Sequence, residues 1–278
     1  MELSRTRELL PTVIWRESSP STNAELRELA AAGSPLPHGA LLATANQTAG
    51  RGRLDRGWVT PPGTAIAASL LVRGFGRSGL GASWLPLLAG SAVVAALQPF
   101  FADGRRVGVK WPNDVHVRDE DDAIAGRPGL KLCGILCEMI DADAVVVGTG
   151  INLLIPEREL PTDRATSLLA AGADLGVGAG GEPSLAGEAG RGLADRVLSA
   201  YAAELLSLVE LAVAHPDAAR GRAARHSLTL GTEVRVHLPG GEIVHGRARA
   251  LAHDGALVVD LPTGGSLAVS AGDVEHLR

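Results

Sequence analysis

Hydrophobic and polar residues follow patterns along most of the chain that predict a mixture of strands and helices. Short apolar, β-branched runs bounded by turn residues predict strands at 12–16, 40–45, 64–72, 107–111, 130–140 and 144–154. Longer apolar stretches predict helices from Thr22 to about Ala32, from about Ser83 to Leu97, and from the end of 172–187 to about Val213. Thr22-Asn23-Ala24-Glu25 matches a capping box that opens the first helix, and Gly33 is its expected end. The strands on either side of Asp141-Ala142-Asp143 are expected to form a hairpin.

Polar and glycine-rich stretches separate these elements and are expected to be loops. They are a Gly/Arg segment at 48–57, a charged hairpin tip at 118–129 and a low-complexity segment at 172–187. From Leu228 onward the pattern changes to short strands separated by Pro-Gly-Gly, His-Asp-Gly and Thr-Gly-Gly. About 50 residues of this kind are typical of a small all-β barrel. We therefore expect an α+β domain at 1–225 and a second domain at 226–278.

Composition narrows the class of protein. Of 278 residues, 46% are hydrophobic and 21% charged, which is the range of globular proteins. The 26 basic and 31 acidic residues give a net charge of -5, the wrong sign for a protein whose main task is to grip nucleic acid or an anionic membrane. We expect no apolar run of membrane-spanning length, no signal peptide and no disulfide framework from two cysteines. These expectations place the protein in the cytoplasm.

The rare residue types are concentrated in a few segments. Lys110 and Lys131 are the only lysines, and the four asparagines are Asn23, Asn46, Asn113 and Asn152. Each lies in a segment that other features also single out. Cys133 and Cys137 would be about 13 Å apart on one strand, which argues against a disulfide or a shared zinc ion. We expect both in the core, and we expect the four histidines of the tail to be solvated.

The segment Gly50-Arg51-Gly52-Arg53-Leu54-Asp55-Arg56-Gly57-Trp58 is the densest candidate for a binding site. Its glycines allow the backbone to approach a ligand, its arginines suit carboxylates and phosphates, and its tryptophan can stack on a flat ring. The spacing matches neither a Walker A loop nor a dinucleotide-binding motif. A solvated surface loop is the alternative interpretation.

Three further segments could contribute polar groups to a site. Lys110-Trp111-Pro112-Asn113-Asp114 places a lysine and a carboxylate at a rigid turn, although an ordinary surface turn would look the same. Lys131 is expected to share a strand face with Cys133 and Ile135, where a lysine needs an anionic partner unless its side chain reaches solvent at an edge. Gly148-Thr149-Gly150-Ile151-Asn152 either bulges or exposes its backbone to a ligand, with Asn152 available to a base edge.

In chain order, these segments resemble the signature of biotin–protein ligases. The five matching segments are Ser21-Thr22-Asn23, Gln47 before Gly50-Arg51-Gly52-Arg53-x-x-Arg56-x-Trp58, Lys110-Trp111-Pro112-Asn113-Asp114, Gly129-x-Lys131-x-x-Gly134-Ile135-Leu136, and Gly148-x-Gly150-Ile151-Asn152. Any one of them is weak, but five in this order are highly specific, and they span roughly 13–170. Thr60 stands where the family usually has a serine before proline. Ser21 comes too early to leave room for the winged helix of repressor-type members, so the monofunctional type is expected.

The resemblance implies both a fold and a reaction. The fold would be a catalytic domain related to class II aminoacyl-tRNA synthetases, with a mixed and largely antiparallel sheet, followed by an SH3-like barrel. Biotin and ATP, with Mg²⁺ on the triphosphate, would give biotinyl-5′-AMP and pyrophosphate. The adenylate would then acylate one lysine of a biotin carboxyl carrier domain of an acyl-CoA carboxylase or pyruvate carboxylase. No nucleic-acid or membrane partner is expected.

The resemblance also implies three sets of site residues. Because carboxylate attack on a phosphate brings two anions together, cations are needed, and the implied catalytic residues are Lys131, Arg51 and Arg53. The implied biotin-binding residues are Ser21, Thr22, Asn23, Gln47, Gly50, Arg51, Gly52, Arg53, Lys131 and Gly134. The implied ATP-binding and adenylate-binding residues are Arg53, Arg56, Trp58, Lys110, Asn113, Asp114 and Asn152. Asp114 is a candidate Mg²⁺ ligand without a fixed metal site. Since the arginines of 50–57 have no obvious partner in the sequence, we expect this loop to be ordered by ligand.

Two kinds of alternative remain. A lipoate–protein ligase shares the fold and the adenylation chemistry, but the complete Gly-Arg-Gly-Arg and Lys-Trp-Pro-Asn-Asp segments and the β-rich tail favour biotin. A biotin-sensing regulator or a non-catalytic binding module belongs to a different class. The expected lack of a DNA-binding domain argues against the regulator, and Lys131 with the arginines argues against the inactive module.

Overall fold

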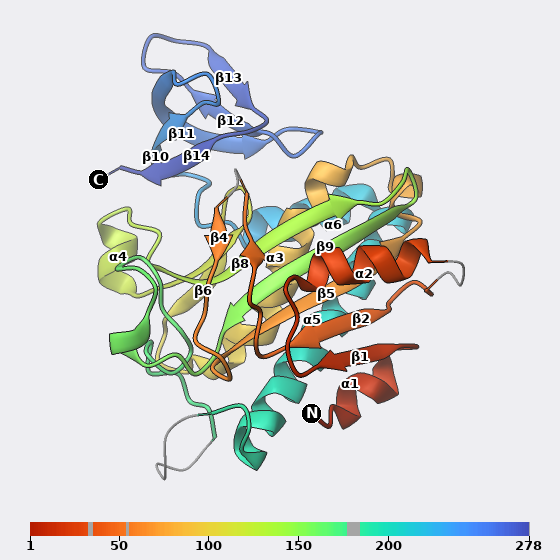
Figure 1. Cartoon of the computed structure of the whole chain (residues 1–278). Helices are drawn as coiled ribbons and strands as arrows, with labels where there is room; N and C mark the ends of the chain where they lie inside the picture. The colour runs from red at the N-terminus through yellow and green to blue at the C-terminus, as the bar shows by residue number, and fades with distance from the viewer. Residues whose placement is uncertain (33–35, 54–55, 177–183, 278) are drawn as a thin grey trace.

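A seven-stranded sheet forms the centre of the computed structural model, which describes residues 1–32, 36–53, 56–176 and 184–277 (Figure 1). The strand order is β1-β2-β5-β9-β8-β7-β6, with β1 and β2 parallel and the other neighbours antiparallel. The strands are β1 (Val13–Arg16), β2 (Leu41–Thr44), β5 (Ala65–Arg73), β6 (Arg106–Lys110), β7 (Asp114–Arg118), β8 (Leu130–Met139) and β9 (Ala144–Asn152). The prediction of a mixed, largely antiparallel sheet is confirmed, and β8 and β9 form the expected hairpin.

Helices cover the two faces of this sheet unequally (Figure 1). The helices are α1 (Ser4–Leu9), α2 (Thr22–Ala31), α3 (Leu85–Leu97), α4 (Glu120–Ile124), α5 (Glu188–Ala214) and α6 (Pro216–Arg225). The long helices α3 and α5 pack together and bury one face in a core that includes Trp84, Leu88 and Tyr201. On the other face α2 covers β2, β5 and β9 around Leu26. The remainder of that face lies open to a cavity.

Two helical segments of the described chain, Ala82–Phe100 and Glu188–Ala214, are long and apolar enough to cross a membrane by length and composition alone. On this measure the expectation that no segment reaches membrane-spanning length is wrong. Their most apolar windows are 67% and 44% buried inside the structure. Both helices pack against the sheet and against each other, which accounts for their apolar composition.

The first turn of α2 differs from the predicted capping box. The N-cap is Ser21 rather than Thr22, and its hydroxyl accepts a hydrogen bond from the Ala24 amide at 3.4 Å. The Glu25 carboxylate does not fold back on the cap; it pairs with Arg16 and accepts a hydrogen bond from the Ser19 hydroxyl at 2.9 Å. The shift of one residue points the Thr22 side chain toward the open part of the sheet. The expected end of this helix, Gly33, lies outside the described residues.

A second sheet follows α6 and is antiparallel throughout. Its strands are β10 (Glu233–His237), β11 (Ile243–Leu251), β12 (Leu257–Asp260), β13 (Ser266–Val269) and β14 (Asp273–His276), in the order β13-β12-β11-β10-β14. Two indoles of the first unit hold the turn between β11 and β12. Trp84 donates to the His253 carbonyl at 2.7 Å, and Trp111 donates to the Gly255 carbonyl at 3.1 Å. The sequence predicted the first four strands and missed β14, which contacts the cavity described next.

Candidate active site

A cavity of about 1160 Å³ lies on the open face of the main sheet. A two-stranded ribbon covers it, made of β3 (Gly50–Arg51) and β4 (Gly57–Trp58). Most of the predicted site residues line it, namely Ser21, Thr22, Asn23, Gln47, Arg51, Gly52, Arg53, Arg56, Trp58, Lys110, Asn113, Asp114, Lys131 and Gly134. Gly50 lines an adjoining space under the ribbon, and Asn152 is not part of the wall. Segments that are weak separately in the sequence therefore meet at one place.

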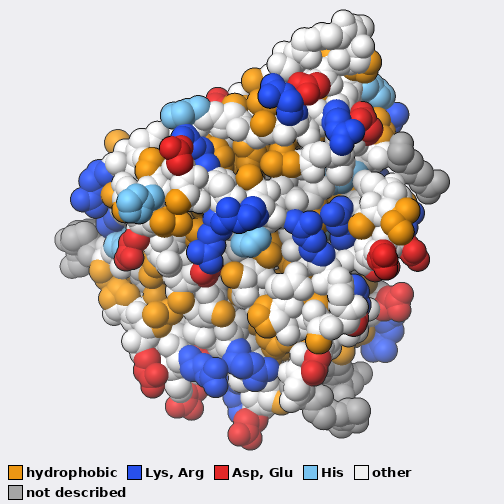
Figure 2. All heavy atoms as spheres, turned by 180° about the vertical axis from the view of Figure 1, so that it is seen from behind, with side chains coloured by type: hydrophobic (Ala, Val, Ile, Leu, Met, Phe, Trp, Pro, Cys, Tyr) orange, Lys and Arg blue, Asp and Glu red, His pale blue; other side chains and the backbone are white. Residues whose placement is uncertain are grey.

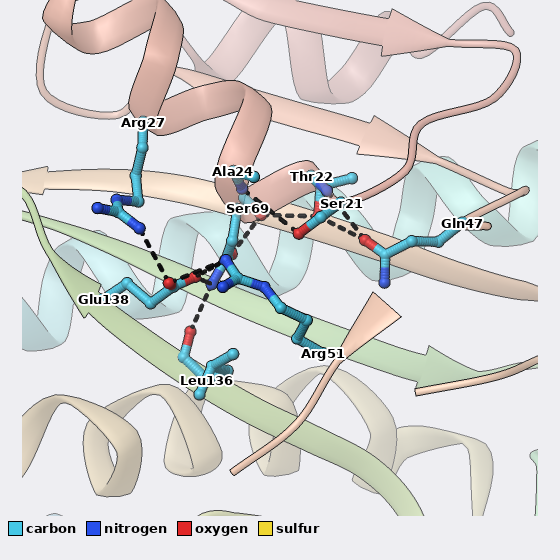
Figure 3. A network of polar contacts seen from close by, with 10 residues as sticks. Ser21, Thr22, Ala24, Arg27, Gln47, Arg51, Ser69, Leu136 and Glu138 are labelled. Atoms are coloured by element: carbon cyan, nitrogen blue, oxygen red, sulfur yellow. Dashed lines mark hydrogen bonds and ion pairs between the residues drawn. The ribbon is translucent and has the colours of Figure 1, made fainter. Parts of the chain in front are cut away.

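One end of the cavity is formed by neutral polar side chains at the start of α2 (Figure 3). The Gln47 carbonyl oxygen accepts hydrogen bonds from the Thr22 amide at 2.9 Å and from its hydroxyl at 3.2 Å. The Gln47 amide nitrogen is therefore the part of that side chain left to donate to a ligand. The Ser69 hydroxyl of β5 lies 2.8 Å from Thr22 Oγ1 and 2.6 Å from Asn23 Oδ1. This end offers several donors and acceptors in fixed positions.

Three glycines form the floor of the cavity. A Cβ atom placed on Gly148 would lie 2.1 Å from Asn23 Oδ1, and one on Gly150 would lie 2.3 Å from the Trp58 indole. A Cβ atom on Gly134 would lie 2.8 Å from the same indole. No side chain fits at these positions without moving its neighbours. The two glycines of 148–152 thus expose backbone to the cavity, as one of the two interpretations of that segment required.

Lys131 reaches the cavity because β8 contains a bulge. The register between β7 and β8 shifts at this point, which leaves Leu132 as an extra residue on β8. Regular alternation would place Lys131 with Cys133 and Ile135, as the sequence predicted, but both of these are buried in the core. The bulge turns Lys131 to the opposite face, beside Gly134, where a Cβ would lie 3.3 Å from Lys131 Nζ. The predicted shared face is therefore wrong, and the cavity face replaces it.

Lys131 stands at the centre of the cavity between a carboxylate and an aromatic ring. Its Nζ lies 2.7 Å from Asp114 Oδ1 and 5.3 Å from the centre of the Trp58 ring. Both distances are within the range of an ion pair and a cation–π contact. Lys110 lies nearby, where burial lowers its pKa, the Asp114 carboxylate raises it and the Lys131 ammonium lowers it further. The middle of the cavity therefore concentrates positive charge.

Two imidazoles, which the sequence did not single out, lie near Lys110. Burial, and then the charge of Lys110, lowers the pKa of His116 to about 4 and that of His276 to about 3. His116 Nδ1 lies 3.1 Å from the Gly129 carbonyl, and His276 Nε2 lies 3.2 Å from the Thr229 hydroxyl. His276 belongs to β14 and lines the cavity, so the expectation that all tail histidines are solvated is wrong. Only the three-dimensional packing of β14 reveals this residue.

The arginines of the ribbon already have partners. Arg51 donates to the Glu138 carboxylate at 3.0 and 3.2 Å, and Arg53 donates to Asn113 Oδ1 at 3.2 Å. Arg56 forms an ion pair with Asp273 of β14. The expectation that these arginines lack partners in the free protein is therefore wrong, because their partners lie up to 217 residues away in the sequence. Leu54 and Asp55 of this segment lie outside the described residues.

The comparisons with known proteins agree with this geometry. Residues 15–152 match the Biotin/lipoate A/B protein ligase family, and residues 229–277 match the Biotin protein ligase C terminal domain. The chain is 38% identical to the biotin–[acetyl-CoA-carboxylase] ligase of Mycobacterium tuberculosis, over 95% of this chain and 90% of that one. The chain belongs to the biotin protein ligase family.

Solved structures of this family have the same fold. The biotin protein ligase from Aquifex aeolicus in complex with biotin and ATP superposes with a TM-score of 0.68 at 25% identity, covering 97% of this chain and 100% of that one. By sequence, a further relative is the bifunctional ligase/repressor BirA of Bacillus subtilis, which is 32% identical over 56% of this chain and 46% of its own length. The first unit therefore has the class II aminoacyl-tRNA synthetase-like fold of these ligases.

The described residues contain no group of three or more His, Cys, Asp or Glu side chains placed to hold a metal ion. An Mg²⁺ ion bound to ATP needs only one or two carboxylates in addition to phosphate oxygens and water. Asp114 fits that role by position, since it lines the cavity beside Lys110 and Lys131. Such an ion would neutralise charge on the triphosphate.

Cys133, Cys137 and Asn152 fill inner positions. Both cysteines are free, and burial raises the pKa of each thiol, to about 12 at Cys137. Asn152 donates to the Thr166 carbonyl at 2.8 Å, while its Oδ1 is buried without a hydrogen-bond partner in the described part of the ligase. A buried acceptor of this kind is costly unless a donor reaches it.

Proposed function

We propose that this chain is an ATP-dependent biotin–protein ligase that forms biotinyl-5′-AMP and transfers biotin to a lysine of a carboxylase carrier domain. The observation that carries this proposal is the position of Lys131 between neutral hydrogen-bonding groups at one end of the cavity and cations at the other. That order matches two substrates bound end to end. Biotin has a polar uncharged head and a carboxylate, and the triphosphate of ATP would lie beyond that carboxylate. The charge order and the chemistry therefore agree.

The first step joins two anions. A carboxylate oxygen of biotin attacks the α-phosphorus of ATP, the new oxygen–phosphorus bond forms, and the bond to the bridging oxygen breaks as pyrophosphate leaves. Lys131 and Arg53 are placed to offset the repulsion between the carboxylate and the phosphate. Lys110 and Arg56 are placed to hold the phosphates that depart. Each of these cations is on the cavity wall before substrate arrives.

The second step is aminolysis of the mixed anhydride. The neutral amine of the acceptor lysine attacks the acyl carbon, AMP leaves with the electron pair of the broken bond, and one proton is released to solvent. Because acyl adenylates hydrolyse readily, water must be kept from the anhydride until the acceptor arrives. The ribbon that carries Arg51 and Trp58 covers the cavity and can serve as this barrier.

The ureido group of biotin and the adenine of ATP each have suitable binding partners. Thr22 and Gln47 are proposed to bind the ureido group, since the Gln47 amide nitrogen donates to no other side chain among the described residues. Trp58 and Asn152 are proposed to hold the adenine; because Asn152 lies behind the cavity wall, the adenine amino group would reach its unpartnered Oδ1 only after the wall moves. The dithiolane of lipoate has no group that could use the polar end of the cavity, which favours biotin over lipoate.

Biotin-dependent exchange of radiolabelled pyrophosphate into ATP tests the proposal. Exchange with biotin and none with lipoate is the expected result, because exchange reports reversible adenylate formation. Exchange that depends on lipoate, or binding of biotin without any exchange, would replace the proposal with the lipoate ligase or with a binding module.

We further propose that the working partner is a carboxylase carrier domain, of acyl-CoA carboxylase or pyruvate carboxylase, in the cytoplasm, and that neither nucleic acid nor membrane is bound. Residues 226–278 would act as a separate domain that closes the ATP end. From Leu228 onward the chain has four arginines and six acids, whereas DNA-binding modules present a basic face. A gel-shift titration with biotin-operon DNA, in the presence of biotin and ATP, should show no salt-sensitive, sequence-specific complex at nanomolar protein.

A further inference from the structure

Glu138 on β8 joins the ribbon to the polar end of the cavity. Its carboxylate accepts from Arg51 of the ribbon at 3.0 Å, from Arg27 of α2 at 3.1 Å and from the Asn23 amide at 2.8 Å (Figure 3). The Glu138 side chain is 17% exposed, whereas its partners Arg27 and Arg51 are 43% and 50% exposed. Glu138 belongs to none of the sequence motifs, and it lines the adjoining space under the ribbon rather than the main cavity.

The ionised carboxylate fixes how Asn23 is oriented. A carboxylate can only accept hydrogen bonds, so the part of Asn23 that faces Glu138 must be its NH₂ group. The same nitrogen donates to the Leu136 carbonyl at 3.0 Å, which occupies its second hydrogen. Asn23 Oδ1 is then turned toward Ser69 and acts there as an acceptor. Together with the Leu136 carbonyl, the Glu138 carboxylate thus sets which part of Asn23 accepts from Ser69.

The pattern continues to the groups proposed to bind biotin. Ser69 lies between Asn23 and Thr22, and Thr22 in turn contacts Gln47. If the Asn23 amide turned over, its NH₂ group would face Ser69, and the single Ser69 proton would have to go to Thr22. The acceptor capacity that Thr22 offers to a ligand would then be reduced.

The ion pair between Glu138 and Arg51 holds the ribbon above Thr22 and Gln47. Arg51 is half exposed and is tied down through Glu138. A Cβ on the adjacent residue Gly50 would lie 2.5 Å from Gln47 Nε2, so the ribbon backbone touches Gln47. The contacts therefore run from Glu138 through Asn23 to Gln47, and from Glu138 through Arg51 back to Gln47. They surround the polar end of the cavity.

We infer that Glu138 is a positioning residue for biotin, which orients the Asn23–Ser69–Thr22 hydrogen bonds and holds Arg51 over the bound head group. The inference rests on the proposed function. It assigns Glu138 to substrate binding and to retention of the adenylate, and it leaves the chemical step to the cations in the middle of the cavity.

The test compares Glu138→Gln with Arg27→Ala in the full-length protein. The glutamine loses the charge that holds Arg51, and it brings an NH₂ group that can face Asn23 in place of the accepting oxygen. Loss of one charge-assisted hydrogen bond corresponds to roughly a tenfold change in affinity. Glu138→Gln is therefore expected to raise the KM for biotin about tenfold and to speed biotinyl-adenylate release by about as much, with kcat for exchange within about threefold. Arg27→Ala removes a partner that does not face the cavity and is expected to leave the biotin KM unchanged.

Other outcomes overturn the inference. An unchanged biotin KM in Glu138→Gln, an equal rise in both variants, or a fall in kcat at constant KM would show that Glu138 is a structural brace or acts on the chemistry. Ser69→Ala interrupts the same contacts without touching Glu138 and should raise the KM in the same direction, with less than additive effects in the double variant. Additive effects would count against the inference. Calorimetric titration with biotin measures binding without catalysis. If the wild-type protein showed no pyrophosphate exchange, the proposed function would be refuted, but calorimetry would still test the role of Glu138.

Discussion

Replacing Lys131 with alanine removes an ammonium group from the centre of the cavity, where the biotin carboxylate and the α-phosphate are proposed to meet. Its Nζ is held 2.7 Å from Asp114 Oδ1 and above the Trp58 ring, so it is in place before the substrates bind. A preorganised cation of this kind stabilises charge in the transition state without reorganising during the reaction. We expect Lys131→Ala to slow adenylate formation.

The structure supports an estimate of the size of this effect. Two unit charges about 4 Å apart interact by about 4 kcal/mol at an effective dielectric constant of about 20. Part of that attraction is offset in the wild type, because Asp114 shares the same ammonium group. In the variant, however, Asp114 loses this partner and repels the incoming anions. A net loss of about 3 kcal/mol, or roughly a hundredfold in rate, is consistent with removal of one electrostatic group from an active site.

Single-turnover formation of biotinyl-5′-AMP at saturating biotin and ATP measures this step directly. Lys131→Arg keeps the charge and is the matched control, which should retain most of the rate. Transfer from preformed adenylate to the acceptor should change less than adenylate formation. A Lys131→Ala rate within a few-fold of wild type would remove Lys131 from the reacting centre.

Three further predictions concern the floor, the ribbon and the ATP end of the cavity. Gly150→Ala places a methyl group against the Trp58 indole and should weaken adenylate retention at least tenfold; Gly192→Ala in α5 is the control, and equal retention in both would contradict the packing argument. Amides of 50–58 should exchange more slowly with biotin bound, because the ribbon then packs on a ligand in addition to the contacts that its arginines already make; equal protection with and without biotin would refute this. The folded-state pKa of His276 lies near 3, below its ordinary value, so the unfolded chain takes up this proton first as the pH falls below 6.5. The free energy of unfolding should therefore decrease between pH 6.5 and 5, and urea titrations should show a smaller decrease in His276→Gln; an unchanged slope would be the contrary result.

The sequence predicts the elements that have strong local patterns. The expected sheet strands, the long helices and the hairpin around Asp141-Ala142-Asp143 are all present, because apolar periodicity and turn residues act over a few positions. The missed elements are short or polar, and they are α1, α4, α6, β3, β4, β7 and β14. Packing against distant parts of the chain stabilises several of them. Asp195 of α5, for example, accepts hydrogen bonds from the Arg5 and Thr6 amides at the start of α1. The six residues of α1 contain no pattern that predicts such a contact.

The site shows the same division between local and distant information. Motifs that contain the rare Lys, Asn and Trp residues identified most of the cavity wall. Glu138, Ser69 and His276 belong to no such motif. Each becomes part of the site through a partner far away in the chain, such as Asn23 for Glu138, which is 115 positions distant. A lone acidic, serine or histidine residue gives no signal of this kind in a sequence.

One face of the main sheet is covered partly by helix α2 and partly by the cavity. This face therefore needs apolar residues in one part, and glycines with a lysine in the other. Where α2 covers the sheet, Leu26 and its neighbours fill the space with apolar side chains. Beyond the N-terminus of α2 the strands present Gly134, Gly148 and Gly150, whose missing side chains leave room for the Trp58 indole and for a ligand. The bulge at Leu132 then turns a single lysine of β8 out of the core and into that room. Removing side chains from the floor creates the space, and a shift of one residue in register supplies the charge that the chemistry requires.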